Sequence, residues 1–153
     1  MARFGDLSEA EIAHLQNLEM PVFAGRPWVT GPPLSQRRIA IVSTAGLHRP
    51  GEPTFAPGSG DYRTIPRTSP SGQLQMSHVS TNFDRSGYQQ DVNVVFPIDR
   101  LIELEGRGKV GSAADFHYSF MGATPPERME ASARDLADLL KKDRVNGVIL
   151  CPV

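Results

Sequence analysis

The chain has 153 residues and a net charge of −1, a size that suits one domain with a sizeable core and a charge that gives no case for binding nucleic acid or an anionic membrane. No apolar run approaches the roughly 18 residues of a membrane span, and the N-terminus lacks the pattern of a signal peptide, so we expect a cytoplasmic protein. The single cysteine, Cys151, excludes an internal disulfide and a cysteine-rich zinc site.

Residues 1–37 predict a short helix followed by an extended, proline-rich arm. The helix is expected over residues 8–19, because Ser8 and Glu11 have the spacing of a capping box ahead of an apolar stripe. Trp28 lies in the arm, and we expect it to pack the arm against the body of the protein.

An α/β domain is expected over residues 38–153, since it contains two short, continuous apolar runs typical of strands buried on both faces of a parallel sheet. These runs are residues 38–43 and 147–153. Residues 44–48, directly after the first run, are small residues and a histidine, and loops at the carboxyl ends of parallel strands line ligand sites. His48 is therefore either a site residue or a solvent-exposed loop residue.

The other elements are predicted from turn residues and hydrophobic periodicity. Residues 49–60 are rich in proline and glycine and predict a long loop of the kind that forms binding lids. Strands are expected at residues 61–66, 73–79, 92–96 and 115–122, and helices at residues 97–105 and 125–142. The order predicts a three-layer α/β fold of the flavodoxin or Rossmann type, with a mostly parallel sheet flanked by helices. It is expected to be incomplete at the C-terminus, because no helix follows the last strand.

Polar side chains that could hold a substrate are concentrated in residues 77–101. An arginine matches a carboxylate through paired hydrogen bonds, and a histidine at a strand end can act as an acid or a base. The same residues could instead tie loops or support helix starts, and the histidines are too widely spaced to predict a metal site. Cys151 on an apolar strand predicts a buried, inert thiol. The candidates are His48, Asp61, Arg63, His78, Asn82, Asp84, Arg85, Asp91, Asn93, Asp99, Arg100 and His117.

The sequence lacks the standard motifs of nucleotide-binding loops, serine hydrolases and zinc proteases: Gly-x-Gly-x-x-Gly, Gly-x-x-x-x-Gly-Lys-Ser/Thr, Gly-x-Ser-x-Gly and His-Glu-x-x-His. Composition and spacing alone therefore indicate an α/β domain with a polar crevice.

Several phrases of the sequence occur together in one known family. The longest are residues 91–101, which contain Asn-Val-Val-Phe-Pro-Ile-Asp-Arg-Leu, and residues 117–122, His-Tyr-Ser-Phe-Met-Gly. Shorter phrases lie at residues 44–48, 60–63, 77–80 and 83–85. From residue 38 to its C-terminus, the chain resembles the selenoprotein B subunit of the glycine, sarcosine, betaine and D-proline reductases.

The resemblance implies reductive cleavage of a C–N bond in an amino acid or its N-methylated relative, with electrons from a dithiol that becomes a disulfide. In that family, the strand that matches residues 147–153 runs into a selenocysteine, or a cysteine in variants. This residue attacks a substrate that is bound to a carbonyl (pyruvoyl) group on a partner subunit. The present chain ends before that position, so we expect a truncation at a selenocysteine codon read as a stop. Other reductase subunits and a small amino acid or betaine-like substrate are the expected partners.

Within this resemblance, crevice residues are expected to position the substrate or the selenolate. These are His48, Arg63, His78, Asn82, Asp84, Arg85, Asp91, Asn93 and His117. Cys151 stands three positions before the missing residue, a spacing seen in redox pairs, and is the candidate resolving thiol. No cofactor or metal is expected in this chain itself.

Two other interpretations stay open at the level of the sequence. The chain could be a catalytically silent module that binds a small carboxylate or serves as a subunit of a complex. It could also be an unrelated hydrolase or isomerase that uses His78 and Asp84 as acid and base. The unfinished sheet edge further predicts self-association, and hence an oligomer.

Overall fold

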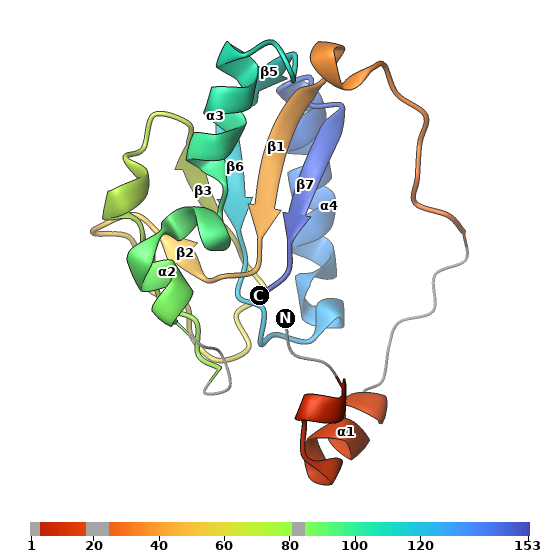
Figure 1. The fold of residues 1–153 in the computed structure, drawn as a ribbon, viewed down its shortest axis with the longest axis vertical. Coiled ribbons are helices and arrows are strands. Elements are labelled where there is room, and N and C mark those ends of the chain that lie inside the picture. Colours follow the sequence, from red (N-terminus) through yellow and green to blue (C-terminus); the bar gives the residue numbers. More distant parts are fainter. Residues whose placement is uncertain (1–3, 18–24, 81–84) are drawn as a thin grey trace.

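The computed structural model describes residues 4–17, 25–80 and 85–153, and a five-stranded sheet forms its centre (Figure 1). β1 pairs in parallel with β7 along one edge, and with β5 and then β6 along the other. β3 pairs antiparallel with β6 and closes that side of the sheet. The strands are β1 (Arg38–Ser43), β3 (Arg63–Pro66), β5 (Ser112–Ala113), β6 (Phe116–Ser119) and β7 (Gly147–Cys151). β2 (Leu47–His48) and β4 (Gln75–Met76) form a separate antiparallel pair.

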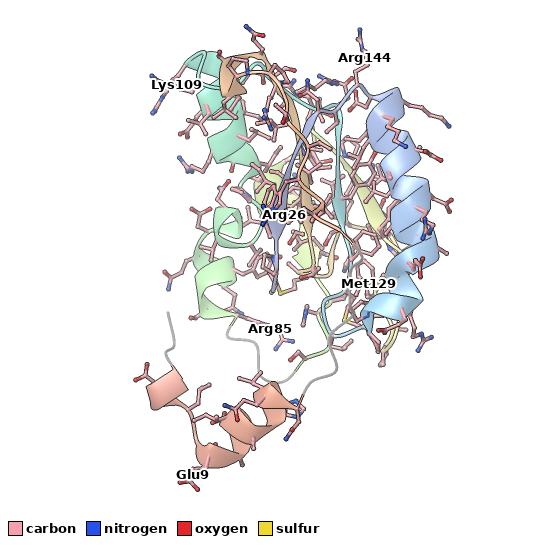
Figure 2. The ribbon with its side chains drawn as sticks, turned by 90° about the vertical axis from the view of Figure 1, so that its right-hand side faces the viewer. Glu9, Arg26, Arg85, Lys109, Met129 and Arg144 are labelled. Atoms are coloured by element: carbon pink, nitrogen blue, oxygen red, sulfur yellow. The ribbon has the colours of Figure 1, made fainter. Side chains whose placement is uncertain are left out.

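Helices lie on both sides of this sheet, as Figure 2 shows for α3 on one side and α4 on the other. The α-helices are α1 (Glu9–Gln16), α2 (Ser86–Gln90), α3 (Ile98–Gly106) and α4 (Pro126–Lys142). Short 3-10 helices are η1 (Phe4–Asp6), η2 (Leu34–Gln36), η3 (Ser71–Gln73) and η4 (Val92–Val94). The fold is thus a mixed α/β fold with a partly parallel sheet, whereas the flavodoxin or Rossmann type stays a prediction. Among the described residues, no helix has the length and apolar character needed to cross a membrane.

β1 lies in the middle of the sheet, and its consecutive residues Ile39, Ala40 and Ile41 are all buried there. Ile39 and Ile41 are buried against the side of α3, whose Leu101 belongs to the same core cluster. On the side of α4, Leu136 packs with Tyr118 of β6 in a second cluster. Burying a large apolar side chain of this kind contributes about 1.5–3 kcal/mol, so the two clusters fix the helices on the sheet.

The predicted strand over residues 92–96 is wrong. Val92–Val94 forms the 3-10 helix η4 instead, because the carboxylate of Asp91 accepts a hydrogen bond from the main-chain N–H of Asn93 at 2.9 Å. Such a local bond bends the backbone into a turn before it can extend. The strand predicted over residues 73–79 is also mostly absent, since only Gln75–Met76 pairs as β4.

The last strand, β7, differs from the prediction of a strand buried on both faces. Among the strands that the structure describes it pairs only with β1, so it is an edge strand, and Val148 and Leu150 are 44% and 73% exposed. Their neighbour Ile149 packs against the core on the opposite face. A continuous apolar run reads alike in a central strand and in an edge strand, and for that reason the sequence did not separate the two cases.

The N-terminal arm carries one confirmed prediction and one wrong one. Ser8 and Glu11 form the expected capping box at the start of α1, while the end predicted at residue 19 lies outside the described residues. Trp28 was expected to pack against the body, but it is 87% exposed. It lines one wall of an open groove between α4 and β7, so its ring stays mostly in solvent.

Candidate functional site

The candidate site lies where β1 and β7 end together. Ser43 of β1 is in register with Cys151 of β7, and both strands run in the same direction, so their carboxyl ends share one edge of the sheet. Figure 1 shows the C-terminus directly beside the end of β1. We call this region the carboxyl edge; it is formed by Thr44, Gly46, His78, Gly122 and Val153.

Gly46 brings the loop after β1 into contact with the segment that carries His78. Its backbone has a φ of 66°, a left-handed conformation that glycine adopts without steric cost. A Cβ at this position would lie 3.0 Å from the main-chain nitrogen of His78. The Ser77 N–H donates to the Gly46 carbonyl at 2.9 Å, and the Gly46 N–H donates to the carbonyl of Phe120 at 2.8 Å. Glycine is therefore required here both by conformation and by close approach.

His78 is buried at the carboxyl edge and is only 6% exposed. Its Nδ1 accepts a hydrogen bond from the Ser80 N–H at 3.2 Å, so in the neutral ring the proton is on Nε2. Burial and the nearby Arg85 guanidinium lower the pKa of His78 below its ordinary value of 6.5, while the main chain of Val153 acts in the opposite direction. The ring is therefore a neutral hydrogen-bond donor at pH 7.

Arg85 is fixed beside His78 by main-chain contacts. Its Nη2 donates to the carbonyl of His78 at 2.6 Å and to that of Ser80 at 3.1 Å. A guanidinium has five N–H donors, so donors besides those of Nη2 could meet a carboxylate. The structure thus brings together two of the predicted substrate-binding residues, His78 and Arg85. Asn82 and Asp84, which were predicted for the same loop, lie outside the described residues.

His117 lies inside the sheet rather than at the carboxyl edge. Its side chain is completely buried, and Nδ1 accepts the main-chain N–H of Ile41 at 3.0 Å. This bond fills the break between β5 and β6, where β1 would otherwise lack a partner. Burial, and to a smaller extent Arg67, lowers the pKa of His117 to about 4. The geometry indicates a structural role for a residue that was predicted to bind substrate.

Arg63 and His48 lie at the base of the 49–60 loop. The Arg63 guanidinium forms an ion pair with Asp61 at 2.5 Å, donates to the Pro53 carbonyl at 3.1 Å and lies 4.4 Å from the ring centre of Phe55. His48 is 4% exposed, so the solvent-exposed alternative for it is wrong. The contacts of Arg63 with Pro53 and Phe55 hold the 49–60 loop onto the body of the domain, so they indicate a structural role for Arg63.

Asp91, Asn93 and Asp99 form a second polar cluster, at the start of α3. The Asn93 amide nitrogen donates to the carboxylates of Asp91 at 2.7 Å and Asp99 at 2.9 Å, and its oxygen accepts the Asp99 N–H at 3.0 Å. Asp91 and Asp99 also line a cavity of about 270 Å³. The remaining candidate, Arg100, pairs with Glu103 on the exposed face of α3. The cluster acts as a helix cap, so two of the predicted substrate-binding residues, Asp91 and Asn93, serve the start of α3.

Cys151 is half-buried at the end of β7 and packs against the core. Burial raises the pKa of its thiol, which lowers the fraction of reactive thiolate at neutral pH. Its role as a resolving thiol stays a prediction, and this environment disfavours it. Within the described residues, no group of three or more His, Cys, Asp or Glu side chains could hold a metal ion.

Sequence reasoning missed Thr44 and Gly122 as individual residues of the carboxyl edge. Thr44 Oγ1 accepts the Val153 N–H at 2.8 Å, across 109 positions of sequence. The Gly122 N–H donates to the Thr44 carbonyl at 2.7 Å. Both residues lie within phrases that resemble the family, and their places just after β1 and β6 were the available signal.

The fold and the site together define the class of this protein. It is an α/β domain whose polar residues lie at the carboxyl ends of parallel strands. Residues 13–153 match the model of the family described as glycine/sarcosine/betaine reductase selenoprotein B. The match covers most of the sequence, and the chain belongs to this family.

Curated relatives are subunits of reductases with different names. The chain is 28% identical over 120 residues to the D-proline reductase subunit gamma of Acetoanaerobium sticklandii, which covers 76% of this chain and 49% of the relative. It is 31% identical over 124 residues to the glycine reductase complex component B subunit gamma of Symbiobacterium thermophilum, a match that covers 76% of this chain and 28% of the relative. The betaine reductase complex component B subunit beta of Peptoclostridium acidaminophilum is 29% identical over 123 residues, with the same coverage. The matched region thus spans less than half the length of these relatives, and no solved structure matches the chain.

Proposed function

We propose that this chain is part of a reductase-complex subunit that cleaves a C–N bond in substrates of the glycine, sarcosine, betaine or D-proline type. Membership of the family and the names of the relatives support the reductase complex. The observation that carries the proposal is the geometry of the carboxyl edge, where Thr44 holds the main chain of Val153 and Gly46 contacts the segment that carries His78. The electrons would come from a dithiol that is oxidised to a disulfide as the C–N bond is broken.

A selenocysteine, or a cysteine, following Val153 would supply a nucleophile that is ionised at neutral pH. The residues of this chain would orient that nucleophile and bind the substrate beside it. The Nε2–H of His78 would donate a hydrogen bond to the anionic group, and Arg85 would attract the substrate carboxylate. Partner subunits of the same complex would hold the substrate through their carbonyl (pyruvoyl) group.

The first test is the DNA sequence beyond the codon of Val153. A TGA codon followed by an open frame that encodes a nearby cysteine supports the proposal. A TAA or TAG codon, or a closed frame, contradicts the selenocysteine part of it.

The second test is the reaction itself, with the chain extended by selenocysteine or cysteine and combined with its partner subunits. Dithiol-dependent release of ammonia from glycine, methylamine from sarcosine or trimethylamine from betaine, or opening of the D-proline ring, would identify the substrate. We expect His78→Ala to lower kcat by about 100-fold if the ring acts on the reacting atoms. The matched control His14→Ala lies on the exposed helix α1 and should leave the rate unchanged.

The binding module is the second candidate, favoured by the Arg85 guanidinium that is fixed beside the buried His78. It predicts that glycine or betaine binds to the 153-residue chain with a measurable heat in titration calorimetry, and that Arg85→Ala abolishes this heat. Binding by the chain together with no reduction by its extended form would favour this candidate over the reductase.

A further inference from the structure

We infer that Thr44 and Gly122 are positioning residues, which clamp the main chain at Val153 so that the residue following it stands beside His78. The inference rests on the proposed function, because it assigns these two residues the task of aiming the nucleophile. It concerns contacts between the loops after β1 and β6 and the exit of β7.

Thr44 makes three hydrogen bonds to the exit of β7. Its main-chain N–H donates to the Cys151 carbonyl at 3.1 Å, which extends the ladder between the two strands by one step. Its hydroxyl then accepts the Val153 N–H at 2.8 Å and lies 3.3 Å from the Val153 carbonyl oxygen, to which it donates. Both polar main-chain groups of Val153 are thus bound by one side chain.

The carbonyl of Thr44 explains why a side chain is needed at this point. In the parallel ladder between β1 and β7 it would accept the Val153 N–H, but it accepts the Gly122 N–H at 2.7 Å instead. The Thr44 hydroxyl accepts the Val153 N–H in place of that carbonyl. The threonine therefore fixes the direction of the chain after the strand has ended.

Gly122 closes the clamp from the other side. A Cβ at this position would lie 2.3 Å from the Val153 carbonyl oxygen and 3.0 Å from Thr44 Oγ1. Gly122 is not among the glycines with a left-handed backbone, so close approach rather than conformation requires glycine here. A single added methyl group would push the main chain of Val153 away from Thr44.

His78 gives the clamp its functional meaning. Gly46, two positions after Thr44, approaches the main chain of His78 so closely that a Cβ there would lie 3.0 Å from the His78 nitrogen. The main chain of Val153, which Thr44 holds, is in turn a hydrogen-bond partner of the His78 ring. A nucleophile on the next residue would start from a fixed main chain next to a neutral N–H donor. A contact that merely ended the strand would have no effect on the distance between the next residue and His78.

The first experiment tests the clamp in the 153-residue chain. Thr44→Val keeps the shape of the side chain but removes both hydroxyl bonds, and hydrogen exchange of the Val153 amide should become roughly tenfold faster. Thr44→Ser keeps the hydroxyl and should exchange as the wild type does. The Ile41 amide, buried in β1, is the internal control. An unchanged Val153 amide in Thr44→Val would overturn the clamp.

The second experiment tests positioning, in the chain extended past Val153 with cysteine at the next position. Its alkylation by iodoacetamide is followed against pH, and we expect a midpoint below the ordinary thiol value of about 8.5 because His78 stabilises the thiolate. Thr44→Val and Gly122→Ala should return the midpoint towards the ordinary value, while Thr44→Ser should not. Gly106→Ala is the matched control, since nothing lies within 4 Å of a Cβ there.

The outcomes separate the inference from the function on which it rests. Fast exchange with an unchanged alkylation midpoint would make Thr44 a purely structural residue and overturn the positioning role. A shifted midpoint in a protein that reduces no substrate would uphold the positioning role and reject the proposed reaction. Gly122→Ala gives an independent reading if Thr44→Val does not fold.

Discussion

His117 illustrates how a single side chain can complete a sheet. The main-chain N–H of Ile41 lies where β5 has ended and β6 has begun to pair with β1, and the imidazole Nδ1 accepts it. An unpaired buried N–H would cost about 1–3 kcal/mol, so the histidine replaces the missing carbonyl. The ring also meets Phe96 edge to face, with the centres 6.0 Å apart. Only the neutral ring can accept the bond, which makes the contact sensitive to pH.

Stability should therefore fall in acid through His117. Its pKa is lowered to about 4 in the folded chain from an ordinary 6.5, so the unfolded chain binds the proton first. The stabilisation is complete above pH 6.5 and is lost as the pH falls from 6.5 to about 4, by roughly 3 kcal/mol. Urea unfolding at a series of pH values measures this loss.

His117→Asn should lower the stability at pH 7 and flatten this part of the pH dependence, since it removes the titrating ring. His14→Asn on the exposed helix α1 is the control and should leave the curve as it is. An equally steep curve in His117→Asn would show that other groups, such as His78 with its lowered pKa, cause the loss.

At the scale of elements, α3 starts in an unusual way. Its N-cap position is Pro97, which has no side chain able to accept the free N–H groups of the first turn. Asn93 does so from four residues upstream, since its amide oxygen accepts the Asp99 N–H at 3.0 Å. The turn η4 places Asn93 there, so the loss of the predicted strand and the start of α3 have one cause.

Removing this cap should destabilise the whole domain, because α3 covers one face of the sheet through the buried Leu101. We expect Asn93→Ala to lower the free energy of unfolding by about 1–2 kcal/mol. Asn93→Asp should not rescue it, since a third carboxylate would then lie between Asp91 and Asp99. Asn17→Ala, at the end of a helix that buries no described residue, should leave the urea midpoint unchanged.

At the scale of the whole molecule, the outer side of β7 is open. Val148 and Leu150 project from it into a groove of about 460 Å³, with Leu140 of α4 and Trp28 of the arm along the walls. An exposed apolar edge strand is a template for pairing with a further strand. The edge carries no charged side chain within Gly147–Cys151 that would discourage such pairing.

The chain should consequently self-associate as its concentration rises, and sedimentation velocity would measure it. We expect Leu150→Lys to shift the half-association concentration upward by at least about tenfold, the equivalent of 1.4 kcal/mol, because it removes apolar area and adds charge repulsion. Leu104→Lys, at a 39% exposed position on α3, is the matched control. A wild-type chain that stays monomeric at every concentration would contradict the prediction.

Local pattern was sufficient for the elements whose cause is local. The apolar run of β1, the capping box of Ser8 with Glu11 and the periodicity of α4 were predicted from neighbouring residues, and all three are present. The family was also readable from short phrases, because the order of residues within a phrase is a property of the sequence itself. His78 and Arg85 were both predicted as substrate-binding residues because they lie in one polar stretch of the sequence, and the structure brings them into contact.

Only the tertiary structure decided what depends on distant parts of the chain. Whether a histidine faces a site or completes a sheet depends on where strands break, and whether an apolar strand is central or at the edge depends on its partners. Thr44 meets Val153 across 109 positions of sequence, a contact that no periodicity encodes. The sequence alone determined the elements and the family, while the packing of β1, β6 and β7 determined which residues meet at the carboxyl edge, because register and burial arise only when distant strands pair.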